Sequence, residues 1–152
     1  MSQTEEFVKV VEAAKEAKGV IFVTGKPGSG KSKVLREAAE DKKWDYVDCR
    51  LLISEEFLAG PKEEWNAKAP EMMGEALAIY NSDVILLDRL QTLFVPVFNL
   101  DVASLLKDLG QKFVLVAAWP GYVKDGTLCY DKFDGTESIR IPQDGFTIWN
   151  VD

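Results

Sequence analysis

The chain has 152 residues, a length that suits one domain with a buried core. Hydrophobic residues make up 47% and charged residues 28%, which is the balance of a folded globular protein and excludes a disordered chain. Histidine is absent, so Ser-His-Asp catalysis and most zinc sites are excluded as well. The net charge of −7 opposes direct binding of nucleic acid by this chain alone.

Membrane and secretory signals are also missing from the sequence. No apolar run approaches the roughly 18 residues of a membrane span, and the charged, periodic N-terminus is unlike a signal peptide. Cys49 and Cys129 lie too far apart for a metal motif and are expected to be buried free thiols, as in a reducing compartment. We therefore expect a cytoplasmic protein without membrane contact, built as one domain over residues 1–152.

Hydrophobic periodicity and turn residues define the expected elements in chain order. The pattern predicts helices over 3–18, 31–41, 54–58, 70–80 and 101–109, and strands over 20–24, 46–49, 83–88, 113–118, 137–141 and 146–149. Ser54 is expected to cap the third helix, and Pro70 to be the first residue of the fourth, after a loop over 61–69. An Asp-Gly turn inside 122–130 predicts a β-hairpin.

Strands and helices alternate up to residue 118, and the strands are continuous apolar runs. Such runs are typical of a parallel sheet with helices on both faces. The expected fold class is therefore α/β: a P-loop NTPase with a doubly wound, mostly parallel sheet. Its nucleotide-binding core would cover residues 20–118, and residues 119–152 would form a short β-rich tail with no helical lid.

The stretch GKPGSGKS, between the first strand and the second helix, matches the phosphate-binding motif G-x-x-x-x-G-K-[ST]. Its glycines permit a tight backbone path that turns successive N–H groups toward phosphate oxygens, and the following helix adds its positive dipole end. Lys31 would contact the β and γ phosphates, and Ser32 would bind Mg²⁺. The expected nucleotide-binding residues are Gly25, Lys26, Pro27, Gly28, Ser29, Gly30, Lys31, Ser32 and Lys33.

A second part of the expected site is the run DVILLD, in which four apolar residues precede Asp88. Ligands of open α/β sheets bind at the carboxyl ends of the strands, where Asp88 is expected. This carboxylate would hold Mg²⁺ through water, together with Ser32, and Lys31 and Asp88 are the expected catalytic residues. The plainer alternatives are a chance match in a glycine-rich turn and an acid that only ends its strand.

The residues that could support hydrolysis form an incomplete set. Arg89, not glutamate, follows the strand acid; it could stabilise γ-phosphate charge, but a salt bridge to Asp88 or a surface position explains it as well. Gln91 could orient the attacking water or simply be solvated. Arg36 is expected on the solvated side of its helix, and Trp119 stands where a polar residue would be useful after the fourth strand. We expect nucleotide binding with weak or partner-dependent hydrolysis.

The segment LQTLFVPVFNL, residues 90–100, is apolar for a loop that flanks the nucleotide site. It fits internal packing and an exposed surface for a partner equally well. The sequence leaves both interpretations open.

Taken in order, TGKPGSGKS, VILLDRLQTLF, VLVAAWPG and GTLCY resemble the BrxF family, the small P-loop component of type 3 BREX bacteriophage-exclusion systems, over about residues 20–142. The resemblance implies a cytoplasmic, prokaryotic ATP-binding subunit that acts with larger BREX-type defence proteins. Self-association is the alternative that we keep for its partner. It carries over the cradle from Gly25 to Ser32 and the acid Asp88, with ATP and Mg²⁺ as cofactors. A glutamate after the strand acid is missing from the family as well, so hydrolysis stays open.

Two other functions are compatible with the sequence. A stand-alone small-molecule or nucleotide kinase would need a second substrate pocket and an arginine-bearing lid. Residues 119–152 contain one arginine, Arg140, and their pattern predicts β structure, so the sequence argues against a kinase. A structural subunit with a vestigial cradle would have no reason to keep the glycines, Lys31, Ser32 and Asp88 together. The preferred prediction is a regulatory ATP-binding module.

Overall fold

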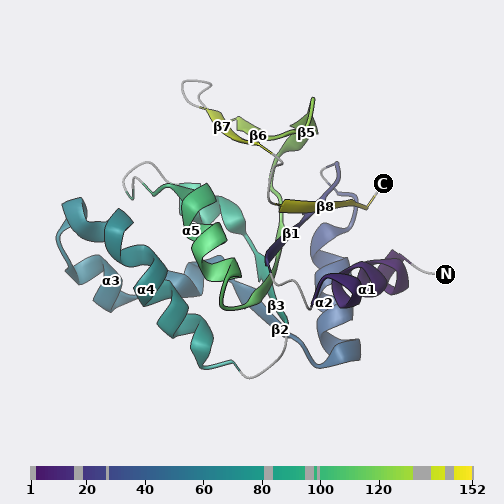
Figure 1. Cartoon of the computed structure of the whole chain (residues 1–152), viewed down its shortest axis with the longest axis horizontal. Coiled ribbons are helices and arrows are strands. Elements are labelled where there is room, and N and C mark those ends of the chain that lie inside the picture. Colours follow the sequence, from purple (N-terminus) through teal and green to yellow (C-terminus); the bar gives the residue numbers. More distant parts are fainter. Residues whose placement is uncertain are drawn as a thin grey trace.

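The computed structural model describes residues 3–15, 19–26, 28–80, 84–94, 98, 100–131, 138–142 and 146–151. Its centre is a five-stranded sheet in which every neighbouring pair of strands is parallel. The strands lie in the order β2 (Asp45–Asp48), β3 (Val84–Asp88), β4 (Val114–Ala118), β1 (Gly19–Thr24) and β8 (Phe146–Asn150). The predicted α/β class with a parallel sheet is confirmed (Figure 1).

Helices α1 (Gln3–Ala14) and α2 (Lys31–Lys42) cover one face of this sheet (Figure 1). Successive side chains of a strand point to opposite faces, so every second strand residue packs against these two helices. The buried residues on this face include Phe7, Val11, Ile21, Val23, Val34, Leu35, Leu86 and Val116. The α1 helix ends within the predicted range, and residues 16–18 lie outside the described part of the chain.

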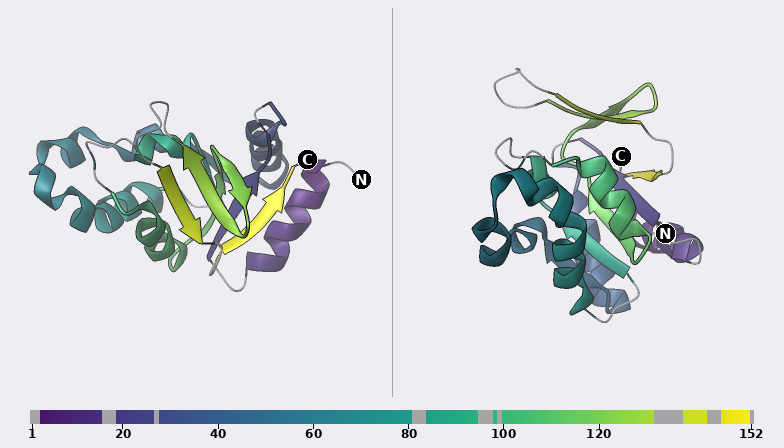
Figure 2. Two further views of the ribbon diagram at one scale, coloured as in Figure 1. Left: turned by 90° about the horizontal axis from the view of Figure 1, so that it is seen from above. Right: turned by 60° about the vertical axis from the view of Figure 1, so that its left-hand side comes forward.

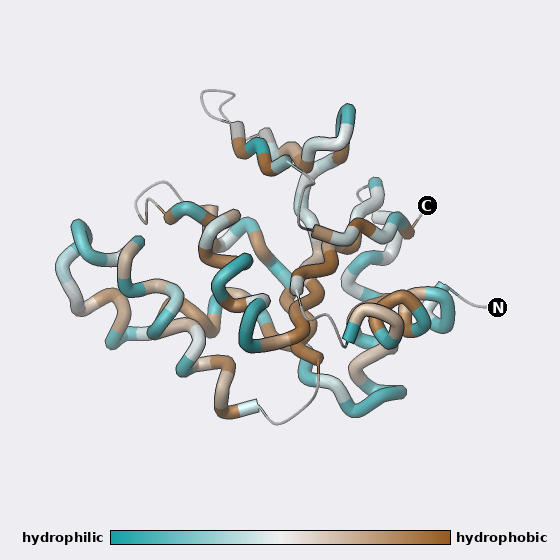
Figure 3. The backbone as a smooth tube through the Cα atoms, in the orientation of Figure 1, coloured by the Kyte–Doolittle hydropathy of each residue, from teal (hydrophilic) through white to brown (hydrophobic). Residues whose placement is uncertain are grey.

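The opposite face is covered by α4 (Trp65–Ala78) and α5 (Val102–Gly110), with α3 (Glu55–Ala59) packed beside α4. Ser54 caps α3 as predicted, because its hydroxyl accepts a hydrogen bond from the Phe57 N–H at 3.0 Å. Figure 3 shows strongly hydrophobic residues along the central strands, between the two helical layers. The buried residues on this face include Phe22, Val47, Met73, Leu77, Ile85, Leu87, Leu106 and Leu115.

A second, antiparallel sheet stands at the carboxyl end of the main sheet, as Figure 2 shows from two further directions. Its strands are β5 (Tyr122–Lys124), β6 (Thr127–Asp131) and β7 (Ser138–Pro142). The turn between β5 and β6 is Asp125-Gly126, so the predicted hairpin is confirmed.

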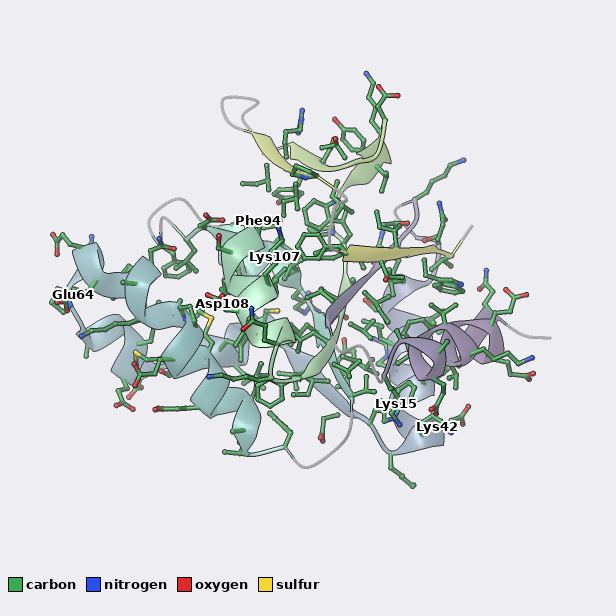
Figure 4. The ribbon with its side chains drawn as sticks, viewed as in Figure 1. Lys15, Lys42, Glu64, Phe94, Lys107 and Asp108 are labelled. Carbon is green, nitrogen blue, oxygen red and sulfur yellow. The ribbon has the colours of Figure 1, made fainter. Side chains whose placement is uncertain are left out.

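Trp119 connects this small sheet to the core. Its side chain is fully buried, and its indole Nε1–H donates to the Cys129 carbonyl at 2.9 Å. Its backbone N–H donates to the Val23 carbonyl in β1 at 2.8 Å. Phe94, labelled in Figure 4, packs against the rings of both Trp119 and Tyr130. The position directly after β4 therefore carries a buried aromatic side chain and not a polar one.

Two predictions about secondary structure are wrong in detail. The α4 helix begins at Trp65, so Pro70 lies inside it and does not start it. Trp65 is buried and its ring stacks on Phe57 at 5.6 Å, and this contact favours an earlier helix start despite the hydrogen bond that proline cannot donate. The last strand, β8, lies beside β1 in the main sheet and not in the sheet of the tail.

Other expectations concern exposure. The described part of the apolar segment 90–100 packs internally, because Leu90, Leu93 and Phe94 are buried, whereas residues 95–97 and 99 lie outside the described residues. Cys49 and Cys129 are buried free thiols, as predicted. Within the described residues, the helices are all too short or too polar to cross a bilayer.

Candidate functional site

The predicted phosphate cradle lies between β1 and α2. Gly30 precedes α2 with a φ of +99°, a left-handed conformation that favours glycine. At Gly25 a Cβ atom would lie 2.5 Å from Ser29 Oγ, so any other residue there would displace the Ser29 side chain from its present position. A hydrogen bond of 2.9 Å from the Ser29 N–H to the Lys26 carbonyl completes the turn. Pro27 lies outside the described residues.

Several donors of the cradle suit a phosphate group. No side chain caps the N-terminus of α2, which leaves its first N–H groups available. Ser29 Oγ is buried and has no hydrogen-bond partner among the described residues. Lys31 Nζ donates to the Gly25 carbonyl at 2.8 Å, so its charge lies over the loop. Unpaired donors beside a positive charge are what phosphate oxygens require, and the residues present fit a nucleotide's phosphates.

One cleft of about 250 Å³ brings together the predicted catalytic and metal-binding residues. Its lining includes Lys31, Ser32, Asp88, Arg89 and Gln91, together with Arg36. The expectation for Arg36 is therefore only half right, since its side chain is exposed yet borders this cleft.

Three other predicted cradle residues are outside this lining. Gly25 and Lys26 border a separate cleft of about 240 Å³ together with Tyr122 of the small sheet. The Lys33 side chain is 73% exposed and pairs with Glu37 at 3.8 Å, one turn along α2.

Asp88 ends β3, as predicted, and is only 7% exposed. Its Oδ1 accepts the Arg89 backbone N–H at 2.9 Å, and its Oδ2 accepts the hydroxyl of Tyr46. Among the described residues, no lysine or arginine forms an ion pair with this carboxylate. A buried carboxylate that has neutral donors but no cationic partner suits a metal ion such as Mg²⁺.

A second acid, Asp48, ends the neighbouring strand β2 in register with Asp88. Arg50 donates to it from Nε at 3.0 Å and Nη2 at 2.8 Å, and Arg89 Nε lies 3.0 Å away. Burial raises the pKa of Asp48, the hydrogen bonds and charge of Arg50 and the charge of Arg89 lower it, and the net effect is a pKa below the usual value. The ion-pair partner of Arg89 is therefore Asp48 and not Asp88.

Arg89 reaches Asp48 from an uncommon backbone conformation. Its φ is +59°, in the left-handed region that costs a residue with a side chain about 1 kcal/mol or more. This turn directs the guanidinium toward the end of β2 while the backbone N–H stays on Asp88. Gln91 follows in the short 3₁₀ helix Leu90–Phe94 with its side chain exposed at the cleft.

Tyr46 is half-buried on β2, two residues before Asp48. Burial, followed by the hydrogen bond and the charge of the Asp88 carboxylate, raises the pKa of Tyr46 to about 12. A hydrogen bond and the positive charge of Arg36 act in the opposite direction. The phenol therefore keeps its proton at neutral pH and donates a hydrogen bond to Asp88. Neither Tyr46 nor Asp48 stands out in the sequence, because only the pairing of β2 with β3 places them beside Asp88.

Comparisons with known proteins add little to this site. No protein-family model matches the chain, and no curated protein matches it. A DNA replication initiation factor of known structure aligns with 78% of this chain and 38% of its own, at 19% identity and a TM-score of 0.39. A signal transduction ATPase with numerous domains and a tetratricopeptide repeat sensor, from Pyrococcus horikoshii, aligns with 95% of this chain and 22% of its own, at 15% identity and a TM-score of 0.42. This chain thus spans less than half of either protein, and TM-scores below 0.5 assign it no function.

Proposed function

We propose that this chain is a doubly wound P-loop NTPase domain without a helical lid, which binds Mg²⁺–ATP and hydrolyses it slowly on its own. The observation that carries the proposal is the single cleft that Lys31, Ser32 and Asp88 share beside the glycine cradle. The cradle supplies unpaired donors, and Asp88 supplies a buried negative charge without a cationic partner among the described residues. Each feature suits one part of a metal-bound triphosphate.

Each residue has a separate task in this proposal. Lys31 would exchange the Gly25 carbonyl for phosphate oxygens, and Ser32 and Asp88 would hold the metal, the latter through water. When bound, Mg²⁺ neutralises charge on the β and γ phosphates. The described residues contain no group of three or more metal-ligating side chains, and Mg²⁺ bound to phosphates needs only one or two protein ligands. Isothermal titration with Mg²⁺–ATP tests the proposal, and the absence of binding at millimolar nucleotide would refute it.

Slow hydrolysis follows from what surrounds Asp88. The next residue is Arg89, whose guanidinium lies on Asp48, so it stabilises an acid of its own chain and not a phosphate. Gln91 is the remaining candidate at the cleft for orienting a water molecule. We expect the purified protein to turn over ATP more slowly than about 1 s⁻¹, the lower end for efficient phosphoryl-transfer enzymes. A faster rate without any partner would contradict this part of the proposal.

We further propose that the protein acts in the cytoplasm as a regulatory subunit with larger proteins of a BREX-type phage-defence system. The support for this role is the resemblance of the cradle, the segment after Asp88 and the turn after β4 to BrxF. Purification from the native cell with and without Mg²⁺–ATP, followed by ATPase assays on the co-purifying proteins, tests it. Recovery of the protein alone, or only as a self-associated species, would contradict the proposed partnership.

A further inference from the structure

Tyr46 is placed to reach Asp88 by the register of two strands. In the β2–β3 pair, Tyr46 lies beside Leu86, and Asp48 lies beside Asp88. Side chains two residues apart share a face of the sheet, so Tyr46 and Asp88 lie on the same face, one step apart along the strands. The Tyr46 ring packs with the residues between the sheet and α2, and its hydroxyl donates to Asp88 Oδ2.

The two hydrogen bonds of Asp88 act on different oxygen atoms. The Arg89 N–H holds Oδ1 and the Tyr46 hydroxyl holds Oδ2, so rotation of the carboxylate about its last bond breaks one or both. Each carboxylate oxygen can accept about two hydrogen bonds or ligands, which leaves one position on each for a metal ion or a metal-bound water. The arrangement therefore fixes the direction of the carboxylate without using up its capacity to bind.

We propose that Tyr46 is a positioning residue for the metal site: its hydroxyl holds the Asp88 carboxylate in the orientation that receives Mg²⁺ on a bound nucleotide. This inference rests on the proposed function. A tyrosine that only packed would contribute its ring next to α2, and phenylalanine would serve equally well there. The hydroxyl also interacts with the Arg36 guanidinium, but a role through Arg36 would change nucleotide affinity with and without Mg²⁺ alike. The hydroxyl makes the difference, because it reaches Asp88, a carboxylate that lines the cleft and forms no ion pair among the described residues.

Tyr46→Phe removes the hydroxyl and keeps the ring, so it isolates this role. The affinity for a fluorescent ATP analogue is measured with excess Mg²⁺ and with EDTA, and the ratio of the two affinities gives the metal-dependent gain. Partners that orient metal ligands are typically worth 10–100-fold in metal affinity, so we expect Tyr46→Phe to lower this ratio about tenfold. The affinity in EDTA should change less than about twofold, because the cradle is untouched. Tyr80→Phe, which removes a hydroxyl from a half-buried tyrosine on the other side of the sheet, should leave both affinities unchanged.

A double mutant separates positioning from general destabilisation. Asp88→Ala should abolish the metal-dependent gain, and Tyr46→Phe should then have no further effect, because the group that it orients is gone. A further loss in the Asp88→Ala background, or an equal loss with and without Mg²⁺, would overturn the inference. Melting temperatures check folding, and Tyr46→Met, which also lacks the hydroxyl, gives the same prediction if Tyr46→Phe fails to fold.

The same measurements distinguish failure of this inference from failure of the proposed function. If the wild-type protein binds no nucleotide in either condition, the proposed function fails and the role of Tyr46 fails with it. If the wild-type protein shows a metal-dependent gain that Tyr46→Phe leaves intact, the nucleotide site stands and only the role of Tyr46 is wrong.

Discussion

Replacing Lys31 with alanine removes the charged side chain that is proposed to contact the β and γ phosphates, and it leaves the backbone donors of the cradle in place. In the structure Lys31 Nζ donates to the Gly25 carbonyl at 2.8 Å, so the substitution also removes one hydrogen bond from the nucleotide-free protein. A hydrogen bond that involves a charged group contributes about 1.5–3 kcal/mol, less where water reaches it. The quantity to compare is therefore the shift that the ligand causes, and not the melting temperature itself.

The size of that shift can be estimated. Ligand at about one hundred times its dissociation constant stabilises the folded state by about 2.7 kcal/mol. For a chain of 152 residues, 1 kcal/mol raises the melting temperature by about 2–4 °C, so wild-type protein should gain about 5–11 °C. Loss of one charged contact to phosphate weakens binding by roughly one hundredfold, which leaves about 0.4 kcal/mol, or about 1–2 °C, for Lys31→Ala at the same nucleotide concentration.

Thermal unfolding with and without Mg²⁺–ATP measures both shifts, and Lys42→Ala is the matched control. Lys42 lies at the other end of the same helix, where it pairs with Glu12 at 3.0 Å (Figure 4). Its removal costs at most about 1 kcal/mol and should leave the full ligand-induced shift. A full shift in Lys31→Ala would remove the cradle from the proposed site, and an equal reduction in Lys42→Ala would show that the assay reports general destabilisation.

Three other contacts lead to measurable predictions. Asp48→Asn should destabilise the protein at pH 7, and this loss of stability should shrink below about pH 4. A carboxyl group whose pKa is lowered by folding stabilises the fold above its unfolded-state pKa of about 3.9, and it ceases to do so as the pH falls through its folded-state pKa. Urea unfolding at several pH values measures the difference. Gly121→Ala should cost about 3 kcal/mol or more in urea unfolding, because its Cβ would lie 1.8 Å from the Cys129 carbonyl oxygen. Gly60→Ala is its control, since the nearest atom would be 3.6 Å away, and equal costs would contradict the argument. Ser54→Ala should cost about 1 kcal/mol of stability, because α3 loses its N-terminal cap, and Ser54→Thr should be close to wild type. If Ser54→Ala leaves the free energy of unfolding unchanged, the cap contributes nothing.

The strands and most helices could be predicted because their determinants are local. A buried parallel strand is a continuous apolar run, and Val84–Leu87 followed by Asp88 illustrates both the strand and its end. The start of α4 shows where this reasoning stops. Proline favours the first turn of a helix, but the stacking of Trp65 on Phe57 is a contact between two elements, and it adds helix before Pro70.

The place of β8 could not be predicted for the same reason. Its residues read as a strand, but the choice of neighbour depends on pairing across the whole chain: Val20 lies beside Phe146 and Thr24 beside Asn150. Nothing near residue 146 in the sequence distinguishes an edge strand of the main sheet from a further strand of the tail.

The candidate site likewise has one part that the sequence predicts and one part that it does not. The cradle is local, so the spacing of its glycines, Lys31 and Ser32 predicts it. The surroundings of Asp88 are not local, because the register of β2 on β3 supplies both Tyr46 and Asp48. The direction of the Arg89 side chain depends on a φ of +59°, which a sequence does not reveal for a residue other than glycine.

Two neighbouring strands thus end in an acid, and their surroundings differ in one decisive respect. Asp48 is paired with two guanidinium groups, so its charge is balanced inside the protein. Asp88 receives one amide N–H and one phenol, both neutral, so a cation is expected at Asp88 and not at Asp48. Moving Arg89 toward a γ-phosphate would leave Asp48 with Arg50 alone, and that loss opposes the movement. Under the proposed function, Asp88 holds the metal ion, whereas Asp48 controls whether Arg89 is free to stabilise the γ-phosphate during cleavage. A partner protein that offered Asp48 another cation would release Arg89 for that role.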